Sequence, residues 1–388
     1  MHGWKTVSLG DVCVIEKTKY KDGELPYVGM EDIVSGTGKF VGSREPKKVG
    51  SSTFHFTPEH LLYGRLRPYL NKVLLPDFEG HCSSEIFPLL PKSELDKSFL
   101  FYWITSEQVV KEINRTCTGA RMPRANVNEV LKFDIPIPPI DEQKCIVAIL
   151  DEAFAGIDTA IANTEKNLAN ARELFESYLN SVFSERGEDW EETTLGDSCE
   201  FYNGKAHEKC INESGKFVVV NSKFISSDGA VFKMTDNQLF ALLTKDIAMV
   251  MSDVPKGKAL AKCFLVDVDK KYTLNQRICC IRSSNFVTKY LYYHLNRHPY
   301  LLSFDNGENQ TNLRKNDILK CPLLMPSEEE QSDIVSRLDS MGEGTQQLAA
   351  IYQQKLNSLK ELKQSLLQKA FSGELTAKPD KLIDEAVA

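Results

Sequence analysis

Two stretches of the chain carry apolar residues at alternating spacings of four and three, which is typical of one face of a long helix. The first stretch runs over 150–182 and the second over 338–366. Helix start signals precede both: Pro138-Pro139 lies ahead of the first, and a capping box at 327–330 lies ahead of the second. The pattern predicts two helices of about 43 residues, or roughly 64 Å each at 1.5 Å per residue.

The apolar positions form a narrow seam on an otherwise polar and acidic exterior, which favours pairing of the two helices with each other. The alternative is that each helix is amphipathic and packs on its own domain. The residues predicted to lie at the helix–helix interface are Leu150, Ile157, Ile161, Leu168 and Phe175 of the first helix, and Leu338, Tyr352, Leu356, Leu359 and Leu366 of the second.

The chain is an internal repeat. The segment Trp4–Asp11 recurs as Trp190–Asp197, 186 positions later, and many residues of 119–184 recur 188 positions later without a gap. The repeat predicts four parts and a tail, in the order globular, helical, globular, helical. The predicted boundaries are 1–138, 139–186, 187–326, 327–375 and a disordered tail at 376–388.

The globular parts predict a mixed α and β composition, so the fold class is α+β with a pseudo-two-fold repeat. Aromatic-rich helices are expected at 97–114 and 287–304. Short strands are expected at 25–28, around 74–75 and 86–87, and at 217–220, 263–266 and 278–281.

Composition narrows the class of protein. The chain has 388 residues, 42% hydrophobic and 26% charged, with no apolar run near the ~18 residues of a membrane span. No signal peptide is expected at the N-terminus, and ten Cys without a C-x-x-C pair predict free thiols in a reducing cytoplasm. The net charge of −7 by itself argues against a nucleic-acid binder. The acidity, however, lies in the helical stretches, and each globular stretch is close to neutral.

Motifs for catalysis are missing from the sequence. There is no phosphate-binding loop and no methyltransferase box, and His294-x3-His298 lacks the Glu of a zinc protease motif. His207-x-x-Cys210 has no second pair of ligands, so a zinc site is not expected there. The sequence therefore predicts a chain that has no catalytic role and holds no metal or cofactor of its own.

Loops rich in Arg, Lys and amide side chains are the best candidates for function. Arg can fork onto guanine, Asn and Gln can pair with adenine, and Lys can neutralise phosphate. For a single residue a solvated loop is the competing interpretation, but recurrence of paired loops in both halves favours DNA binding. The predicted DNA-binding residues are Arg65, Arg67, Tyr69, Asn71, Lys72, Arg121, Arg124 and Asn126 in the first half, and Lys256, Lys258, Asn309, Gln310, Asn312 and Arg314 in the second.

These residues carry a resemblance to a known family. The order of variable and helical parts, the Pro-x-Pro-x-x-x-Glu-Gln segment at 136–143 with its echo at 326–331, the loop 65–72 and the Leu-Gly-Asp opening of each half resemble type I restriction–modification specificity subunits. The resemblance covers about residues 3–375. It implies two target recognition domains separated by an antiparallel coiled coil, each domain reading one half of a split DNA sequence, with the helices setting the gap.

The resemblance also implies partners. The chain would dock two modification subunits that use S-adenosylmethionine and two restriction subunits that use ATP and Mg²⁺, and those partners could supply part of the phosphate neutralisation. Three alternatives stay open: an enzyme such as a nuclease, a coiled-coil scaffold without DNA specificity, and a recognition subunit of a related methyltransferase-linked phage-defence system.

Overall fold

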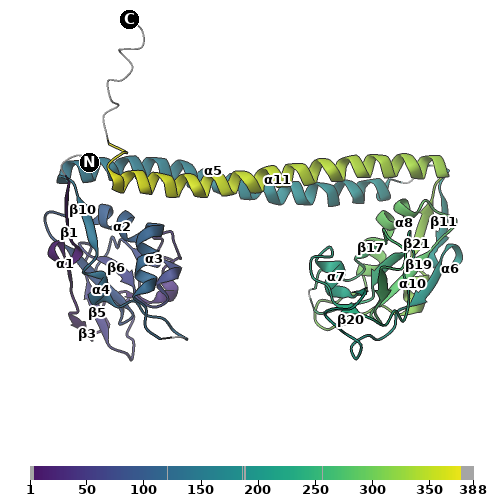
Figure 1. Cartoon of the computed structure of the whole chain (residues 1–388), viewed down its shortest axis with the longest axis horizontal. Coiled ribbons are helices and arrows are strands. Elements are labelled where there is room, and N and C mark those ends of the chain that lie inside the picture. Colours follow the sequence, from purple (N-terminus) through teal and green to yellow (C-terminus); the bar gives the residue numbers. More distant parts are fainter. Residues whose placement is uncertain (1–3, 120, 186, 188, 256, 377–388) are drawn as a thin grey trace, which may run out of the picture. The chain divides into compact units, whose positions relative to one another are not determined.

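The computed structural model describes residues 4–119, 121–185, 187, 189–255 and 257–376. The chain forms two compact units (Figure 1). Unit 1 comprises Met1–Lys166 and Tyr352–Ala388, and unit 2 comprises Asn167–Ile351. Each unit therefore contains one globular part and a part of each long helix. The domain boundaries expected from the sequence stay a prediction, because the units group residues by packing. The predicted tail, apart from Thr376, lies outside the described residues.

The two predicted long helices are α5 (Ile140–Ser184) and α11 (Glu328–Ser372). Each has 45 residues, and both their first and their last residues are 188 positions apart, which is the offset of the sequence repeat. The predicted capping residue is in place, since Ser327 Oγ accepts a hydrogen bond from the backbone N–H of Glu330 (3.3 Å). No helix in the described part of the chain is long and apolar enough to cross a membrane.

Unit 1 contains two four-stranded sheets, in the orders β2-β9-β6-β7 and β3-β5-β8-β4, and a short β1-β10 pair beside the long helices. Its strands are β1 (Lys5–Ser8), β2 (Cys13–Ile15), β3 (Lys19–Tyr20), β4 (Tyr27–Val28), β5 (Thr53–Phe56), β6 (Leu61–Gly64), β7 (Val73–Leu74), β8 (Gly80–Ser83), β9 (Ile86–Pro91) and β10 (Asp134–Ile137). Its helices before α5 are α1 (Leu9–Val12), η1 (Met30–Asp32), η2 (Pro68–Leu70), α2 (Lys97–Thr105), α3 (Glu107–Arg115) and α4 (Val127–Val130).

Unit 2 repeats this plan. Its sheets have the orders β12-β19-β15-β17 and β14-β13-β18, with the short pairs β11-β21 and β16-β20. Its strands are β11 (Glu191–Thr194), β12 (Glu200–Asn203), β13 (Phe217–Val220), β14 (Met234–Thr235), β15 (Ile247–Val250), β16 (Ser252–Asp253), β17 (Cys263–Leu265), β18 (Tyr272–Leu274), β19 (Ile278–Arg282), β20 (Thr311–Asn312) and β21 (Pro322–Met325). Its short helices are α6 (Leu195–Ser198), α7 (Ser222–Ser226), α8 (Thr288–Leu295), α9 (Pro299–Leu302) and α10 (Lys315–Leu319).

Two of the predicted helices are wrong as continuous elements. The helix expected at 97–114 is broken into α2 and α3, because Ser106 adopts extended backbone angles and its Oγ donates back to Trp103 O (2.7 Å). The helix expected at 287–304 is broken into α8 and α9 before Pro299, whose ring disfavours helical geometry at the preceding residue. The predicted strand at 25–28 is limited to Tyr27–Val28, since Pro26 has no N–H to donate.

The long helices run antiparallel within each unit. In unit 1, Glu142 Oε1 accepts from Thr376 Oγ1 (2.7 Å), and Asp158 pairs with Lys363 (2.9 Å). Residues later in α5 therefore contact residues earlier in the second segment, as in an antiparallel pair. In unit 2, Phe175 lies against Gly342, while Leu179 and Leu338 share one core cluster. All ten predicted interface residues are buried or half-buried.

The same apolar faces also contact the globular parts. In unit 1, Leu150 and Ile157 of α5 and Leu367 of α11 belong to one core cluster with α2 and the β2-β9-β6-β7 sheet. In unit 2, the ring of Phe183 packs on Tyr290 of α8 (centroids 5.5 Å apart). Helix pairing and packing on the own domain therefore occur together, although the sequence presented them as alternatives.

Polar side chains join each globular part to its long helix. The Nε1–H of Trp4 donates to Glu142 (3.2 Å), and that of Trp190 donates to Glu330 (2.8 Å). The buried Gln143 donates to Pro138 O (2.9 Å), and the buried Gln331 donates to Pro326 O (2.9 Å). The motifs that revealed the repeat thus fasten the start of each helix to the domain that precedes it.

Candidate nucleic-acid interface

The two predicted loops of unit 1 lie against each other. Leu66 and Arg124 form an antiparallel β-bridge. The backbone N–H of Arg67 donates to Pro123 O (2.7 Å), and that of Ala125 donates to Arg65 O (2.9 Å). Loops that are about 50 residues apart in sequence therefore form one surface, which we call loop surface 1 (residues 65–72, 118–119 and 121–126).

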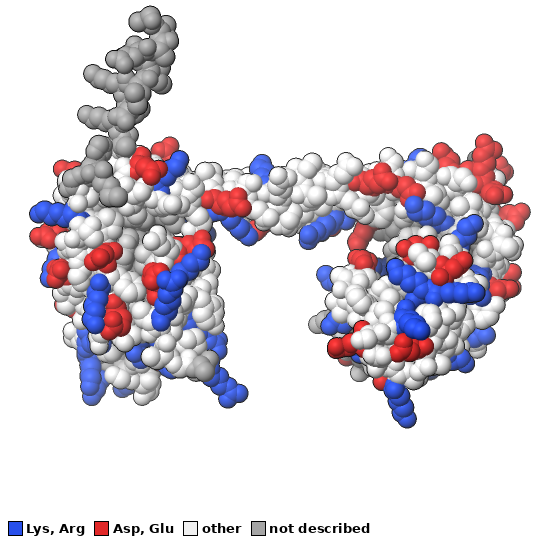
Figure 2. All heavy atoms as spheres, in the orientation of Figure 1, with Lys and Arg blue, Asp and Glu red and all other residues white. Residues whose placement is uncertain are grey.

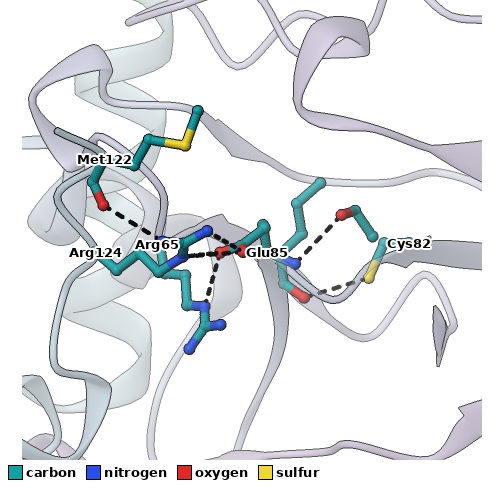
Figure 3. Close-up of polar contacts among 7 residues, drawn as sticks. Arg65, Cys82, Glu85, Met122 and Arg124 are labelled. Carbon is teal, nitrogen blue, oxygen red and sulfur yellow. Dashed lines mark hydrogen bonds and ion pairs between the residues drawn. The ribbon is translucent and has the colours of Figure 1, made fainter. Parts of the chain in front are cut away.

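Glu85, the residue before β9, contacts an arginine from each of the two loops of loop surface 1 (Figure 3). Its carboxylate accepts from Arg65 Nε (3.0 Å) and from Arg124 Nε (3.0 Å) and Nη2 (2.9 Å). Burial works to raise the pKa of Glu85, but the hydrogen bonds and charges of Arg124 and Arg65 outweigh it and hold the pKa below its usual value. The group is therefore a carboxylate shared by two guanidiniums. Glu85 is not among the residues predicted from the sequence, since an acid is not an expected DNA contact.

The other predicted residues of loop surface 1 divide into two groups. Arg67, Tyr69, Arg121 and Asn126 are exposed, and within the described residues no side-chain partner holds Arg67 or Arg121. Arg67 also has a left-handed backbone (φ 50°), which is uncommon for a non-glycine residue and clusters at functional sites. Asn71 and Lys72 are half-buried instead.

Contacts inside unit 1 engage these two half-buried side chains. Asn71 Nδ2 donates to Thr105 O (2.9 Å), and Lys72 Nζ donates to Met30 O (2.5 Å). Their DNA contacts stay a prediction, but both side chains also donate hydrogen bonds to backbone carbonyls of unit 1. The most accessible candidates of the first loop are Arg67 and Tyr69.

The predicted loops of unit 2 are joined in the same manner. Strands β16 and β20 pair Ser252 with Asn312 and Asp253 with Thr311. The side chain of Gln310 donates to Ser252 Oγ (2.9 Å) and lies 3.4 Å from Asn312 Oδ1. We call this area loop surface 2 (residues 252–255, 257–258 and 307–316). It presents linked amides where loop surface 1 presents guanidiniums around a carboxylate.

The remaining predicted residues of unit 2 are Lys256, Lys258, Asn309 and Arg314. Lys258, Asn309 and Arg314 are exposed. Arg314 is the residue that precedes α10, and Lys315 beside it lies over the ring of Phe201 (5.5 Å). Lys256 lies outside the described residues.

Charge is distributed unevenly within each unit (Figure 2). In the view shown, the charged side chains at the end of unit 1 that lies away from α5 and α11 are mainly Lys and Arg. In unit 2 the start of α11 carries Glu328, Glu329 and Glu330 in its first turn, where acidic groups complement the helix dipole. The acidic residues that make the whole chain negative therefore include a helix-capping cluster.

The histidines considered as metal ligands have structural contacts. In His207, Nδ1 is bonded to Lys205 O (2.7 Å) and Nε2 to Thr273 Oγ1 (3.0 Å). The ring of His294 stacks on Phe183 (centroids 4.5 Å apart). Among the described residues, no group of three or more His, Cys, Asp or Glu is placed to hold a metal ion.

Comparison with known proteins places this geometry in a family. Residues 1–170 and 187–361 each match the family described as the type I restriction modification DNA specificity domain. The chain therefore belongs to that family and carries the domain twice. It is a DNA-recognition subunit of the type I restriction–modification class, and the scaffold alternative is not favoured.

Individual relatives agree with this assignment. The chain is 31% identical to the EcoDI specificity subunit of Escherichia coli over 164 residues, which cover 42% of this chain but only 36% of that relative. It is 22% identical to the MjaVIII specificity subunit of Methanocaldococcus jannaschii, over 97% of this chain and 96% of that one. A chain from a solved structure that describes complex assembly and conformational transition of the type I R-M system matches with a TM-score of 0.84 at 22% identity, covering 97% of this chain and 99% of that one, which shows a shared fold.

Proposed function

We propose that unit 1 and unit 2 each read one half of a bipartite DNA target, through loop surfaces 1 and 2. The observation that carries the proposal is the recurrence of the same joined loops in both units. Leu66 pairs with Arg124 in unit 1, and Ser252 pairs with Asn312 in unit 2, at positions related by the repeat offsets of 186 and 188. One backbone arrangement thus presents different side chains in each unit.

The chemistry of each surface suits base edges. Loop surface 1 offers Arg65, Arg67 and Arg124, and guanidiniums pair with the O6 and N7 atoms of guanine. Loop surface 2 offers Gln310 and Asn312, and amides pair with adenine. The two half-sites should therefore differ in sequence.

In this proposal the chain is the non-catalytic member of a larger complex. It would dock modification subunits that use S-adenosylmethionine and restriction subunits that use ATP and Mg²⁺, two of each by resemblance to the family. The complex would act on double-stranded DNA in the cytoplasm. The partners would add to the phosphate contacts that an acidic chain lacks.

Half-site mutants test the division of labour. Arg67→Ala or Arg124→Ala should weaken discrimination in one half-site by ~1–3 kcal/mol per lost base contact, and Gln310→Ala or Asn312→Ala should weaken it in the other. The measurement is the methylation motif of cells that express each variant at limiting enzyme. Identical motifs from both sets of variants would contradict the proposal.

The long helices would set the gap between the half-sites. Two such domains on one face of DNA lie about one helical turn apart, roughly 10 base pairs centre to centre. Inserting four residues after Asn163 and after Ile351, which are equivalent in the repeat, adds about 6 Å to each helix. The gap should widen by about one to two base pairs at ~3.4 Å each, with both half-sites unchanged. A fully active insertion variant with the original gap would show that the helices only tether the domains.

A further inference from the structure

Glu85 of unit 1 and Arg277 of unit 2 occupy the same backbone position. In unit 1, Arg65 donates its N–H to Glu85 O (2.9 Å) and accepts from Ala125 N. In unit 2, Met251 donates its N–H to Arg277 O (3.0 Å) and accepts from Leu313 N (2.8 Å). The same two bonds therefore place Arg277 where Glu85 lies.

The neighbouring strands give the same alignment. Gly64 of β6 pairs with Ile86 of β9, and Val250 of β15 pairs with Ile278 of β19. The residue before the partner strand is position 85 in one unit and position 277 in the other, 192 residues later. The sequence repeat conceals this match, because its clear offsets are 186 and 188.

In unit 1 the acid at this position orients an arginine. Glu85 holds Arg65 through Nε alone (3.0 Å), while the Arg65 guanidinium also lies over the ring of Phe87 (5.0 Å). The two terminal nitrogens of Arg65 then have no partner within the described residues, and Figure 3 shows them turned away from the carboxylate. This terminal pair is the fork that matches O6 and N7 of guanine. Arg124, by contrast, contacts Glu85 through both Nε and the terminal nitrogen Nη2.

In unit 2 the same three positions carry different groups. Met251 replaces Arg65, Arg277 replaces Glu85 and Asn312 replaces Arg124. Arg277 is exposed, and no ion pair or hydrogen bond of its side chain occurs among the described residues. The position thus changes from a carboxylate that orients a neighbour to a guanidinium that is itself available, beside the amides of loop surface 2.

We propose that position 85/277 determines base specificity in each unit. Glu85 is a positioning residue that aims Arg65 at a guanine of one half-site, and Arg277 is a specificity-determining residue that contacts a base pair of the other. This inference rests on the proposed function and adds which position in each unit discriminates between bases.

The test uses the full chain in complex with its modification partner and begins with the wild-type methylation motif. Competition binding then measures discrimination at every base pair of both half-sites. Arg277→Ala should reduce discrimination at one base pair of one half-site by about tenfold to a hundredfold, and leave the other half-site unchanged. Arg277→Lys should restore affinity but little of the discrimination, because Lys keeps the charge and loses the fork.

Glu85→Ala should give a loss of similar size at a guanine of the opposite half-site, and Arg65→Lys should lose discrimination at that same guanine. Glu85→Gln should retain more discrimination than Glu85→Ala, since its amide oxygen still accepts the Nε–H of Arg65. The matched control is Glu112→Gln, which frees Arg115 from an ion pair on α3, in a pocket that α11 also lines. This control should change neither half-site. Recognition of the half-site that the unchanged unit reads shows that each variant is folded.

The outcomes distinguish failure of the proposed function from failure of this inference. A wild-type complex without any sequence preference would overturn both the proposed function and this inference. A bipartite wild-type motif that Arg277→Ala and Glu85→Ala leave unchanged would overturn this inference alone. Equal losses at every base pair of the half-site that unit 1 reads after Glu85→Ala, with no rescue by Glu85→Gln, would mean that Glu85 only holds the two loops together, which also overturns this inference.

Discussion

At the joint between each globular part and its long helix, a Tyr–Asp pair occurs in both units in the same role. Tyr102 donates to Asp151 in unit 1, and Tyr293 donates to Asp339 (2.5 Å) in unit 2. At the loop surfaces the backbone pairing is also the same in both units, but the side chains differ: the paired residue is Arg124 in unit 1 and Asn312 in unit 2. The repeat therefore retains these side chains where they hold the fold, and retains only the backbone at the loop surfaces, which we propose to contact DNA.

Removing a joint glutamine should have the largest effect on stability. Gln143 is fully buried and bonds to Asp96 N, Glu94 O and Pro138 O (2.8–2.9 Å). Gln143→Ala leaves these three backbone groups without their partner, so we expect a loss of about 2–5 kcal/mol in the free energy of unfolding. Chemical denaturation measures it. The control is the exposed Gln353→Ala, which should stay within about 0.5 kcal/mol of wild type. Equal effects of the two variants would show that the joint does not hold the fold.

Acid should destabilise unit 2 through a joint position that differs between the units. His294 follows Tyr293 of the Tyr–Asp pair in unit 2, and the equivalent residue of unit 1 is Trp103, which follows Tyr102. Burial lowers the pKa of His294 to about 3, with the nearby His298 adding to the shift. The folded state therefore binds fewer protons than the unfolded state between pH 6.5 and 3, and stability falls as pH falls through that window. The loss from this residue should reach ~2 kcal/mol at pH 5.

His294→Phe tests this assignment, since the ring keeps its stack on Phe183 and cannot take up a proton. The variant should show a smaller drop in melting temperature between pH 7.5 and pH 5 than wild type. An unchanged drop would place the acid sensitivity elsewhere, for example at His81 of unit 1, whose pKa burial also lowers.

The sequence predicted the elements that depend on local pattern and failed where distant strands decide. The helices at 140–184 and 328–372 are confirmed, because their periodicity and caps lie within each segment. The pairing of loops 65–72 and 118–126 was anticipated only as a shared composition. Glu85 and Arg277 were missed, because their equivalence exists only through the pairing of β6 with β9 and of β15 with β19. The role of Gln143 was missed because its partners lie in the preceding domain.

The glycine of each Leu-Gly-Asp opening should be the next most sensitive position. A Cβ at Gly10 would lie 3.2 Å from Leu131 O, and one at Gly196 would lie 3.1 Å from Leu319 O. Both neighbours are backbone oxygens that cannot move aside, so Gly10→Ala and Gly196→Ala should each cost ~1–2 kcal/mol. The matched pair is Gly156 and Gly344, which also recur 188 positions apart but have open space around them. Alanine at either should raise helix stability by up to ~1 kcal/mol. Thermal unfolding of the four variants checks the opposite signs.

The smallest effect is expected for a contact that unit 1 has and unit 2 lacks at the equivalent positions. Lys363 of α11 pairs with Asp158 of α5 (2.9 Å), and its Nζ lies over the ring of Phe154 (4.6 Å). In unit 2 the repeat places Phe175 and Gln346 there. Asp158 is 60% exposed, so water screens the pair, and Asp158→Asn should change stability by less than about 0.5 kcal/mol. Lys363→Ala should cost more than Asp158→Asn, because it also removes the contact with Phe154. Denaturation at low and high salt measures both. A larger loss for Asp158→Asn that vanishes in high salt would mean that this ion pair, and not the shared apolar seam, holds the helices of unit 1 together.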